Sequence, residues 1–367
     1  MRRVDVIIVG GGVIGLMTGW MLARKGVDAL VVDSGAPAAT DAAAGMLAPS
    51  FEGSLHGGGD ALGAFSAKSL ARWREIAPLL AAASGVDIDF DERGVLCAAL
   101  DDMEARVFEA GAGDSERLDR AGVLALEPSL SSAVRCGWFA RRDGQVDPRR
   151  VRKALRRAVA RDGAALRLGQ RVLAVEMTDG RARGVVLDNG ERLAARKVVI
   201  ATGARIEGVA SLPKGAVFPV KGEAIAVERI EGSPNRVVRT GGAYFCPKSD
   251  GRLVIGATEI PGDKSLNTDE RRLRDLRAAA EAAFPALEKA TEIERWAGLR
   301  PATYDGAPII GPAPATPGVI YALGHYRNGI LLAPATADAV ASLVETGRDG
   351  PEIAAFSAAR FTELGVS

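Results

Sequence analysis

Apolar and polar residues follow one another in an ordered series at the start of the chain. An apolar run at 4–9 predicts a buried parallel strand, and a glycine-rich turn occupies 10–15. Residues 16–25 have a helical pattern, and 28–32 form a second apolar run that Asp33 ends. This order of strand, turn, helix, strand and acid is typical of a βαβ unit that binds a dinucleotide.

The turn itself carries the pattern G-x-G-x-x-G, with Gly10, Gly12 and Gly15 at the three glycine positions. Such glycines permit a tight turn and a close approach of the backbone to a pyrophosphate, which the helix N-terminus also attracts. Asp33 is expected to accept hydrogen bonds from ribose hydroxyls and to repel a 2′-phosphate. The motif does not separate NAD from FAD, and a glycine-rich turn without a nucleotide is the alternative.

The remaining pattern predicts alternating strands and helices. Residues 34–59 are rich in Ala, Gly and Ser and predict a loop. Helices are predicted over 60–83, 147–161, 268–284 and 330–345, and strands over 171–176, 184–187, 197–200, 217–227, 252–257 and 319–323. Because a nucleotide-type unit opens the chain and a strand–glycine–helix unit closes it, we expect a discontinuous nucleotide domain. A mainly antiparallel domain would then be inserted twice.

The helix over 147–161 is densely basic. Asp147 is the expected N-cap and Pro148 the first helical residue. Its basic residues are Arg149, Arg150, Arg152, Lys153, Arg156, Arg157 and Arg161. We interpret them as the solvated face of an amphipathic helix, with a patch for RNA or an acidic partner as the alternative.

Composition narrows the classes of function. A chain of 367 residues suits two domains, and a net charge of +1 disfavours a general nucleic-acid binder. Cys97, Cys136 and Cys246 have no metal or disulfide spacing, and His56 and His325 are the two histidines. We find no targeting segment and no apolar run long enough to span a bilayer, so we expect a reduced, cytoplasmic protein.

Five further segments carry a resemblance to a known family. They are 42–47 (AAAGML), 219–223 (PVKGE), 251–258 (GRLVIGAT), 296–301 (WAGLRP) and 324–336 (GHYRNGILLAPAT). With these segments the whole chain resembles the FAD-dependent D-amino-acid oxidase superfamily, and within it the glycine oxidases of the thiamine pathway.

The resemblance implies an α/β plus α+β fold. A Rossmann-like FAD-binding domain of the glutathione-reductase type is expected over 1–84, 142–212 and 299–367. A substrate-binding domain built on an antiparallel sheet is expected over 85–141 and 213–298.

The resemblance also assigns residues to FAD. Besides Gly10, Gly12, Gly15 and the end of the strand at Thr202 and Gly203, the implied cofactor residues are Val13 and Ile14 at the pyrophosphate, Asp33 and Ser34 at the ribose, Thr40, Ala44, Gly45 and Met46 at the phosphates and flavin, Val172 at the adenine, and His325, Tyr326, Arg327, Asn328, Gly329, Ile330 and Leu331 at the isoalloxazine ring. The N-terminus of the last helix would stabilise negative charge on the reduced flavin. A satisfied or surface histidine is the alternative for His325, which we do not expect to be an acid or base. The cysteine positions imply a non-covalent flavin.

Three residues are implied for the substrate. Arg300 would pair with the substrate carboxylate, because a planar guanidinium binds a carboxylate through two hydrogen bonds. Tyr244 would help to hold the same carboxylate, and Arg327 would lie near the amine, with its backbone carbonyl or its side chain as the contact. The alternatives are a structural arginine for Arg300 and a core tyrosine for Tyr244.

The implied reaction is oxidative deamination of glycine or a small or D-amino acid. Hydride passes from the substrate Cα to flavin, the imine is hydrolysed to a 2-oxo acid and ammonia, and oxygen is reduced to hydrogen peroxide. No side-chain base and no metal are expected. Three residues depart from the family pattern: Asp33 where glutamate is common, Gly242 in place of a histidine near the pocket, and Glu259 in place of an apolar residue. Glu259 would favour a cationic substrate side chain or pair with an arginine.

Other functions stay open at this point. A D-amino-acid dehydrogenase would pass electrons to a quinone, and a tRNA-modifying flavin oxidase would need a basic track. A non-catalytic FAD-binding subunit is a third possibility, which Arg300 and Tyr244 disfavour. The expected partners are a small amino acid and oxygen, with no nucleic acid and no membrane. The expected assembly is a homo-oligomer, either a tetramer or a dimer.

Overall fold

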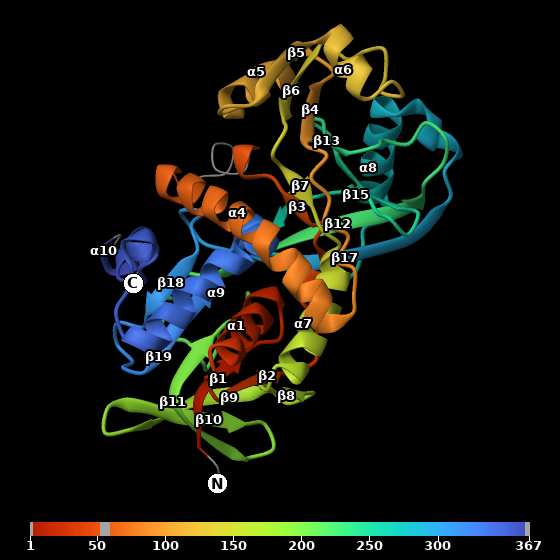
Figure 1. Cartoon of the computed structure of the whole chain (residues 1–367). Helices are drawn as coiled ribbons and strands as arrows, with labels where there is room; N and C mark the ends of the chain where they lie inside the picture. Colours follow the sequence, from red (N-terminus) through yellow and green to blue (C-terminus); the bar gives the residue numbers. More distant parts are fainter. Residues whose placement is uncertain (1–2, 52–58, 364–367) are drawn as a thin grey trace.

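The computed structural model describes residues 3–51 and 59–363 and is built on two large sheets (Figure 1). Strands of the first sheet come from residues 4–33, 165–200 and 309–323, and strands of the second from 95–140 and 218–302. The chain therefore passes between the two sheets several times, as the order of predicted elements indicated.

The first sheet is parallel at its centre. Its order is β18 (Ile309–Pro312), β19 (Val319–Leu323), β11 (Arg192–Ile200), β1 (Val4–Val9), β2 (Ala29–Asp33) and β8 (Ala165–Leu168). Strands β19, β11, β1, β2 and β8 run parallel, and β18 is antiparallel to β19. The hairpin of β9 (Val172–Thr178) and β10 (Arg181–Leu187) joins through β11. Because parallel strands end at one edge, the turns that follow β1, β2 and β11 lie close together.

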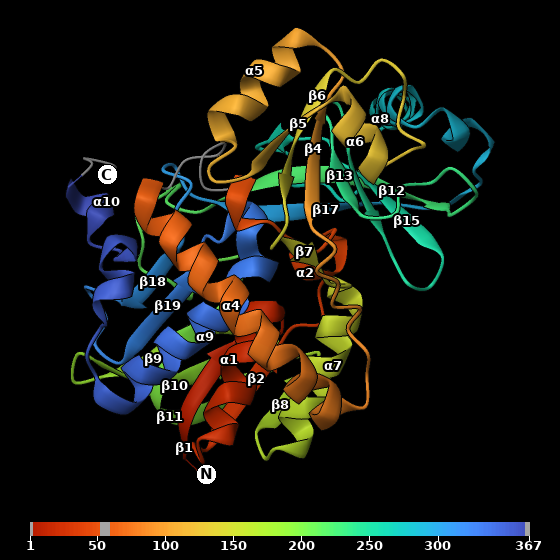
Figure 2. The same ribbon diagram turned by 45° about the horizontal axis from the view of Figure 1, so that its top comes forward.

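Four helices cover one face of this sheet (Figure 2): α1 (Val13–Arg24), α4 (Gly59–Ser84), α7 (Pro148–Arg161) and α9 (Gly329–Thr346). Along β1, Val6 and Ile8 point into the core with these helices, whereas Ile7 and Val9 point into a second core with the β9–β10 hairpin. Both faces of β1 are thus buried from Val6 to Val9, which explains why these four residues are all apolar.

One described helix segment, Tyr326–Thr346, is long and apolar enough to cross a membrane, contrary to the expectation from sequence. However, 67% of its apolar window is buried inside the protein, where α9 packs against α1 and α4. This segment is therefore a core helix of the fold.

The second sheet is mainly antiparallel. Its order is β16 (Ile260–Pro261), β12 (Phe218–Glu228), β15 (Arg252–Gly256), β14 (Tyr244–Pro247), β13 (Val237–Arg239), β4 (Val95–Ala99), β6 (Cys136–Ala140) and β5 (Glu116–Asp119), and β17 (Glu292–Ala302) also pairs with β12. Only the β4–β13 pair among them is parallel. Helix α8 (Glu270–Ala283) packs on this sheet, and α5 (Asp102–Gly111), α6 (Arg120–Leu126) and η1 (Pro285–Lys289) complete this part.

Short elements complete the fold. Between the two parts lie α2 (Ala39–Ala42) and the two-stranded pair β3 (Met46–Leu47) and β7 (Gly144–Gln145). In the first part, η2 (Tyr326–Asn328) precedes α9, and η3 (Pro351–Phe356) and α10 (Arg360–Glu363) follow it and pack beside β18. Helix α2 and strand β3 lie in the segment expected to be loop, and residues 52–58 of that segment lie outside the described residues, with His56 among them. The expected domain limit at 298/299 falls inside β17, which continues to Ala302 in the second sheet. The exact domain limits stay a prediction.

Candidate functional site

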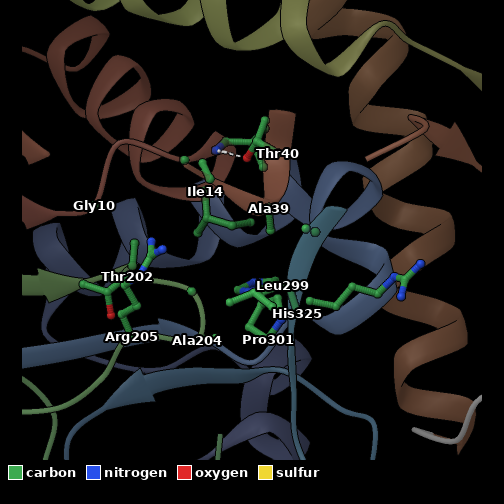
Figure 3. Close-up of a pocket in the computed structure, with 18 of the residues that line it drawn as sticks. Gly10, Ile14, Ala39, Thr40, Thr202, Ala204, Arg205, Leu299, Pro301 and His325 are labelled. Carbon is green, nitrogen blue, oxygen red and sulfur yellow. Dashed lines mark hydrogen bonds between the residues drawn. The ribbon is translucent and has the colours of Figure 1, made fainter. Parts of the chain in front are cut away.

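A cavity of about 410 Å³ lies where the C-terminal ends of the parallel strands meet the second sheet (Figure 3). It brings together nearly all the residues predicted for the cofactor and substrate: Gly10, Gly12, Val13, Ile14, Asp33, Ser34, Thr40, Ala44, Gly45, Met46, Val172, Thr202, Gly203, Tyr244, Arg300 and 325–330. Gly15 and Leu331 are not among the residues that line it. One continuous space therefore runs from the glycine-rich turn to Arg300.

The glycine-rich turn is shaped by close backbone contacts. Gly10 has a φ of 116°, and a Cβ there would lie 2.3 Å from the carbonyl oxygen of Ala201. A Cβ at Gly15 would lie 2.0 Å from the Gly10 oxygen, so Gly15 lets α1 pack on the turn and has no need to touch a ligand. The Thr40 hydroxyl accepts a hydrogen bond of 2.9 Å from the Val13 amide at the start of α1. Thr40 thus fixes the helix end that faces the cavity.

The side chain of Thr202 lies at the cavity that FAD would occupy. The Thr202 Oγ1 is buried and has no hydrogen-bond partner among the described residues. Since buried hydroxyls are nearly always hydrogen-bonded, a ligand in the cavity is the expected partner. With the N-terminus of α1 and the acid at the end of β2, these residues fit the pyrophosphate and ribose of FAD.

Asp33 is held from two sides at the end of β2. Its Oδ1 accepts from the Gly35 amide at 2.7 Å, and its Oδ2 accepts from Nη2 of Arg152 at 3.2 Å. Arg152 also donates from Nε to the Gly11 oxygen at 2.9 Å and pairs with Asp41. The Arg152 side chain is only 10% exposed. A buried arginine thus orients the acid predicted to meet the ribose.

Sequence reasoning missed this role, and the interpretation of α7 as a solvated basic face is wrong for Arg152. The spacing along the helix is the signal that could have shown this. Arg152 is four residues after Pro148 and three before Leu155, so it lies on the same, buried side of α7 as these two. Arg149 also turns inward, because its guanidinium makes two hydrogen bonds, of 2.7 and 2.8 Å, to Glu294 on β17.

The other end of the cavity presents Arg300 and Tyr244 on a floor of glycines. Nη1 of Arg300 donates to the backbone oxygens of Thr258 at 3.2 Å and Lys221 at 3.4 Å. A Cβ at Gly222 would lie 2.2 Å from Nη1 of Arg300, and one at Gly256 would lie 2.3 Å from the Tyr244 hydroxyl. The guanidinium and the phenol rest on strands β12 and β15 at positions that have no side chain.

Electrostatics favour anion binding at this floor. Burial raises the pKa of Tyr244, although the charges of Arg300 and Arg327 oppose that shift, so the phenol stays protonated and can donate. No carboxylate of the described residues forms an ion pair with Arg300. A guanidinium that donates only to backbone oxygens within this part of the chain suits a ligand carboxylate.

The segment after β19 brings His325 to the cavity in its neutral form. Burial lowers the pKa of His325 to about 3, and its Nε2 lies 3.0 Å from the Thr336 Oγ1. An imidazole with this pKa carries no charge near neutral pH. Tyr326 follows with a φ of 45°, a conformation rare for bulky residues.

Glu259 pairs with an arginine at the open end of the cavity. Its Oε2 accepts from Nη1 of Arg327 at 3.0 Å, and its Oε1 accepts a short hydrogen bond from the Tyr326 hydroxyl. Gly242, another of the three departures, does not line the cavity. A Cβ there would lie 2.9 Å from Cβ of Ala279 on α8.

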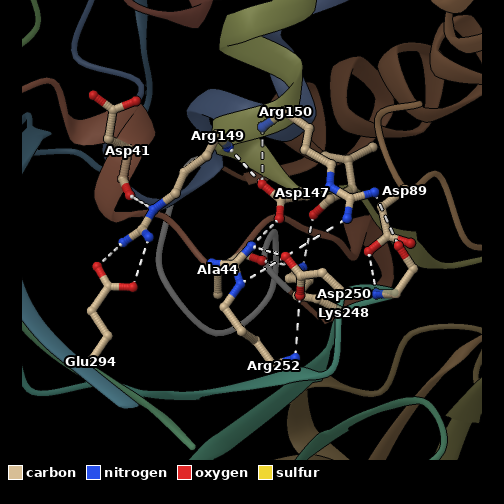
Figure 4. Close-up of polar contacts among 12 residues, drawn as sticks. Asp41, Ala44, Asp89, Asp147, Arg149, Arg150, Lys248, Asp250, Arg252 and Glu294 are labelled. Carbon is tan, nitrogen blue, oxygen red and sulfur yellow. Dashed lines mark hydrogen bonds and ion pairs between the residues drawn. The ribbon is translucent and has the colours of Figure 1, made fainter. Parts of the chain in front are cut away.

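A buried lysine ties the loop at Ala44 to the second sheet (Figure 4). Lys248 follows β14 and is 1% exposed. Its Nζ donates to the oxygens of Ala44 at 2.7 Å, Val146 at 2.8 Å and the Gln145 side chain at 2.9 Å. Burial lowers the pKa of Lys248. No sequence pattern indicates this contact, because a lysine in a polar turn is ordinarily exposed.

Metal and thiol chemistry find no support in the described part of the chain. No group of three or more His, Cys, Asp or Glu there is placed to hold a metal ion. All three cysteines are buried and outside any disulfide, and none lines the cavity.

Comparisons with known proteins agree with this site. The family model of FAD dependent oxidoreductases matches residues 5–343. Glycine oxidase of Geobacillus kaustophilus is 35% identical over 374 residues, which cover 98% of this chain and 97% of that protein. The crystal structure of glycine oxidase from that organism superposes with a TM-score of 0.87 at 34% identity, covering 97% of this chain and 98% of that one.

The bifunctional protein ThiO/ThiG of Synechocystis is also 35% identical; the match covers 97% of this chain and 54% of that protein. The chain thus spans about half the length of this relative and nearly all of the glycine oxidase. The predicted fold class is confirmed, and the chain belongs to the family of FAD-dependent oxidoreductases.

Proposed function

We propose that the protein oxidises glycine or another small amino acid at the carbon that bears the amine, giving a 2-oxo acid, ammonia and hydrogen peroxide. The observation that carries this proposal is the position of Arg300. It lines the same cavity as the glycine-rich turn, and among the described residues it donates only to backbone oxygens. The name of the Geobacillus relative, glycine oxidase, supports the same substrate class.

Bound FAD would supply the oxidation by accepting a hydride from the substrate carbon and passing the electrons to oxygen. The α1 N-terminus, Asp33 and Thr202 would hold the cofactor. Non-covalent binding is supported by the absence of all described cysteines from the cavity lining.

Side chains at the other end would bind and orient the substrate. Arg300 would pair with the carboxylate through two hydrogen bonds, and the neutral Tyr244 would donate a third. His325 has a pKa of about 3 and cannot accept a proton near neutral pH while it stays buried, so it does not act as a base. In this proposal the substrate would react with its amine in the neutral form, and the site would contribute mainly position.

A tRNA-modifying role is less well supported. Several of the basic residues of α7 contact the protein itself, with Arg149 bound to Glu294, Arg152 to Asp33, and Arg161 to the oxygens of Ala82 and Ala83. A helix used in this way does not present a continuous track for a nucleic acid. We further propose a cytoplasmic homo-oligomer that needs neither membrane nor nucleic acid.

The test is to purify the holoprotein and mix it without oxygen with glycine, sarcosine, D-alanine, D-proline or D-lysine while recording flavin absorbance. Peroxide release is then measured in air. Flavin bleaching with peroxide supports the proposal, and bleaching without peroxide identifies a dehydrogenase instead. If none of the five compounds reduces the flavin, small amino acids are excluded as the substrate class.

A further inference from the structure

Two arginines line the cavity where the substrate is expected, and they differ in their partners within the protein. Arg300 donates to backbone oxygens of Lys221 and Thr258. Arg327 instead forms an ion pair with Glu259 at 3.0 Å, and its side chain is 15% exposed. One cation is thus left for a ligand, and the other is already neutralised from within the chain.

Both carboxylate oxygens of Glu259 accept hydrogen bonds from residues that follow β19. Each carboxylate oxygen has its own donor, since Oε1 accepts from the Tyr326 hydroxyl and Oε2 accepts from Arg327. Both donors line the cavity, while the Glu259 side chain is 45% exposed and lies at its outer edge. Glu259 and burial together raise the pKa of Tyr326 to about 12, burial being the larger cause, so the phenol stays neutral.

The consequence for a ligand follows from charge. A substrate with one carboxylate pairs with Arg300 and needs no second cation. A substrate with two carboxylates would place the second near Arg327, where Glu259 has cancelled the attraction and adds its own repulsion. Like charges at close range in a partly desolvated site oppose binding.

We propose that Glu259 is a specificity-determining residue that restricts this site to amino acids with a single carboxylate and excludes dicarboxylic ones. This inference rests on the proposed function, because it assumes that Arg300 binds the substrate carboxylate. The alternative role for Glu259 is that of counter-ion to a cationic substrate side chain. The geometry disfavours it, because both oxygens already have donors within the protein.

The experiment compares sarcosine with iminodiacetate. Sarcosine has a methyl group on its nitrogen, and iminodiacetate has a carboxymethyl group in the same place. In the wild-type holoenzyme, kcat/KM for iminodiacetate is expected to be far below that for sarcosine. Glu259→Gln keeps the size and an oxygen acceptor but removes the charge. It should raise the ratio of kcat/KM for iminodiacetate to that for sarcosine by about tenfold or more, the effect of one like charge at roughly 5 Å in a half-hydrated site.

The matched control is Glu116→Gln. Glu116 on β5 is also 45% exposed and pairs with an arginine, Arg141, at 2.6 Å, away from the cavity lining. Its substitution should leave the ratio within twofold. A ratio that is unchanged in Glu259→Gln, or a preference of the wild type for D-lysine that Glu259→Gln abolishes, would overturn the proposal.

Binding separates this inference from the proposed function. Dissociation constants of acetate and malonate are measured from their effects on the flavin absorbance of the holoenzyme. Glu259→Gln should tighten malonate about tenfold relative to acetate, whether or not any amino acid reduces the flavin. Failure of turnover alone would count against the proposed function, and an unchanged malonate-to-acetate ratio would count against the role of Glu259.

Discussion

Gly222 offers a sharp test of how the second sheet places Arg300. The glycine has no positive φ, so alanine can adopt its backbone conformation. Its added Cβ would lie 2.2 Å from Nη1 of Arg300, whereas ordinary contact begins at 3.4 Å. The guanidinium would therefore have to retreat by about 1.2 Å, the difference between those two distances. Because this group is the tip of a flexible side chain, we expect it to move and the fold to persist.

A shift of this size breaks the geometry of a two-hydrogen-bond carboxylate pair. Hydrogen bonds to charged groups contribute about 1.5–3 kcal/mol each. Losing one to the substrate should thus lower kcat/KM by roughly 10- to 150-fold, since about 1.36 kcal/mol corresponds to tenfold. Gly222→Ala should show this loss for glycine and sarcosine, and acetate should bind more weakly by a similar factor.

A control at Gly63 and a double variant with Arg300 test whether Gly222 acts through Arg300. Gly63 on α4 has open space where a Cβ would be added, with no neighbouring atom within 4 Å, so Gly63→Ala should leave kcat/KM unchanged. If Gly222 acts only through Arg300, then Gly222→Ala adds little to the loss already caused by Arg300→Gln. A full additional loss in the double variant, or a normal acetate affinity in Gly222→Ala, would mean that Gly222 does not act by placing Arg300.

Three further variants test other parts of the site. Lys248→Met should lower the free energy of unfolding, measured in urea, by about 3 kcal/mol, because buried oxygens lose their donor. Burial lowers the pKa of Lys248 in the folded protein, so the unfolded chain binds the proton more tightly. The stability of the wild type should therefore rise toward pH 10 more steeply than that of the variant. The pKa of His325 is about 3 in the folded protein and normally 6.5, a difference that costs the wild type roughly 2–3 kcal/mol of folding free energy between pH 6.5 and 4.5. His325→Gln should therefore lose less stability than the wild type as the pH falls. Equal slopes of stability against pH in the two proteins would argue against a buried neutral imidazole. Arg152→Lys should weaken FAD binding roughly tenfold, because Asp33 loses its hydrogen bond from the guanidinium. Flavin fluorescence measures the dissociation constant. Lys153 is exposed, so Lys153→Met is the control that should bind FAD normally.

Local patterns predicted much of the fold because they act over a few residues. The apolar run at 4–9 is β1, and the acid that ends the second run is the last residue of β2. Asp147 caps α7 by accepting from two backbone amides, as its place before a proline predicted. The predicted strands at 184–187 and 197–200 are parts of β10 and β11, which pair with each other.

Contacts between distant segments could not be predicted in this way. The short helix α2 forms in a segment that has loop composition, and Thr40 from it reaches the Val13 amide. The burial of Lys248 depends on a loop 204 residues earlier in the chain. Glu259 had two possible roles by residue type, and only the fold decides for the arginine. In each case the partner is set by how the two sheets meet, which no local pattern encodes.

Helix α7 shows why these long-range contacts matter for function. Arg152 holds Asp33 at the predicted cofactor end, and Arg149, one turn earlier, makes two hydrogen bonds to Glu294. Glu294 lies on β17, the strand that carries Arg300. The same rigid helix therefore contacts the acid expected at the ribose and the strand expected to bind the substrate. Hydride transfer requires a fixed distance between the two ligands, and misplacement by about 1 Å can cost a hundredfold in rate. A helix whose arginines contact the expected cofactor acid and the expected substrate strand supplies that constraint, which gives Arg149 and Arg152 a structural role within the protein.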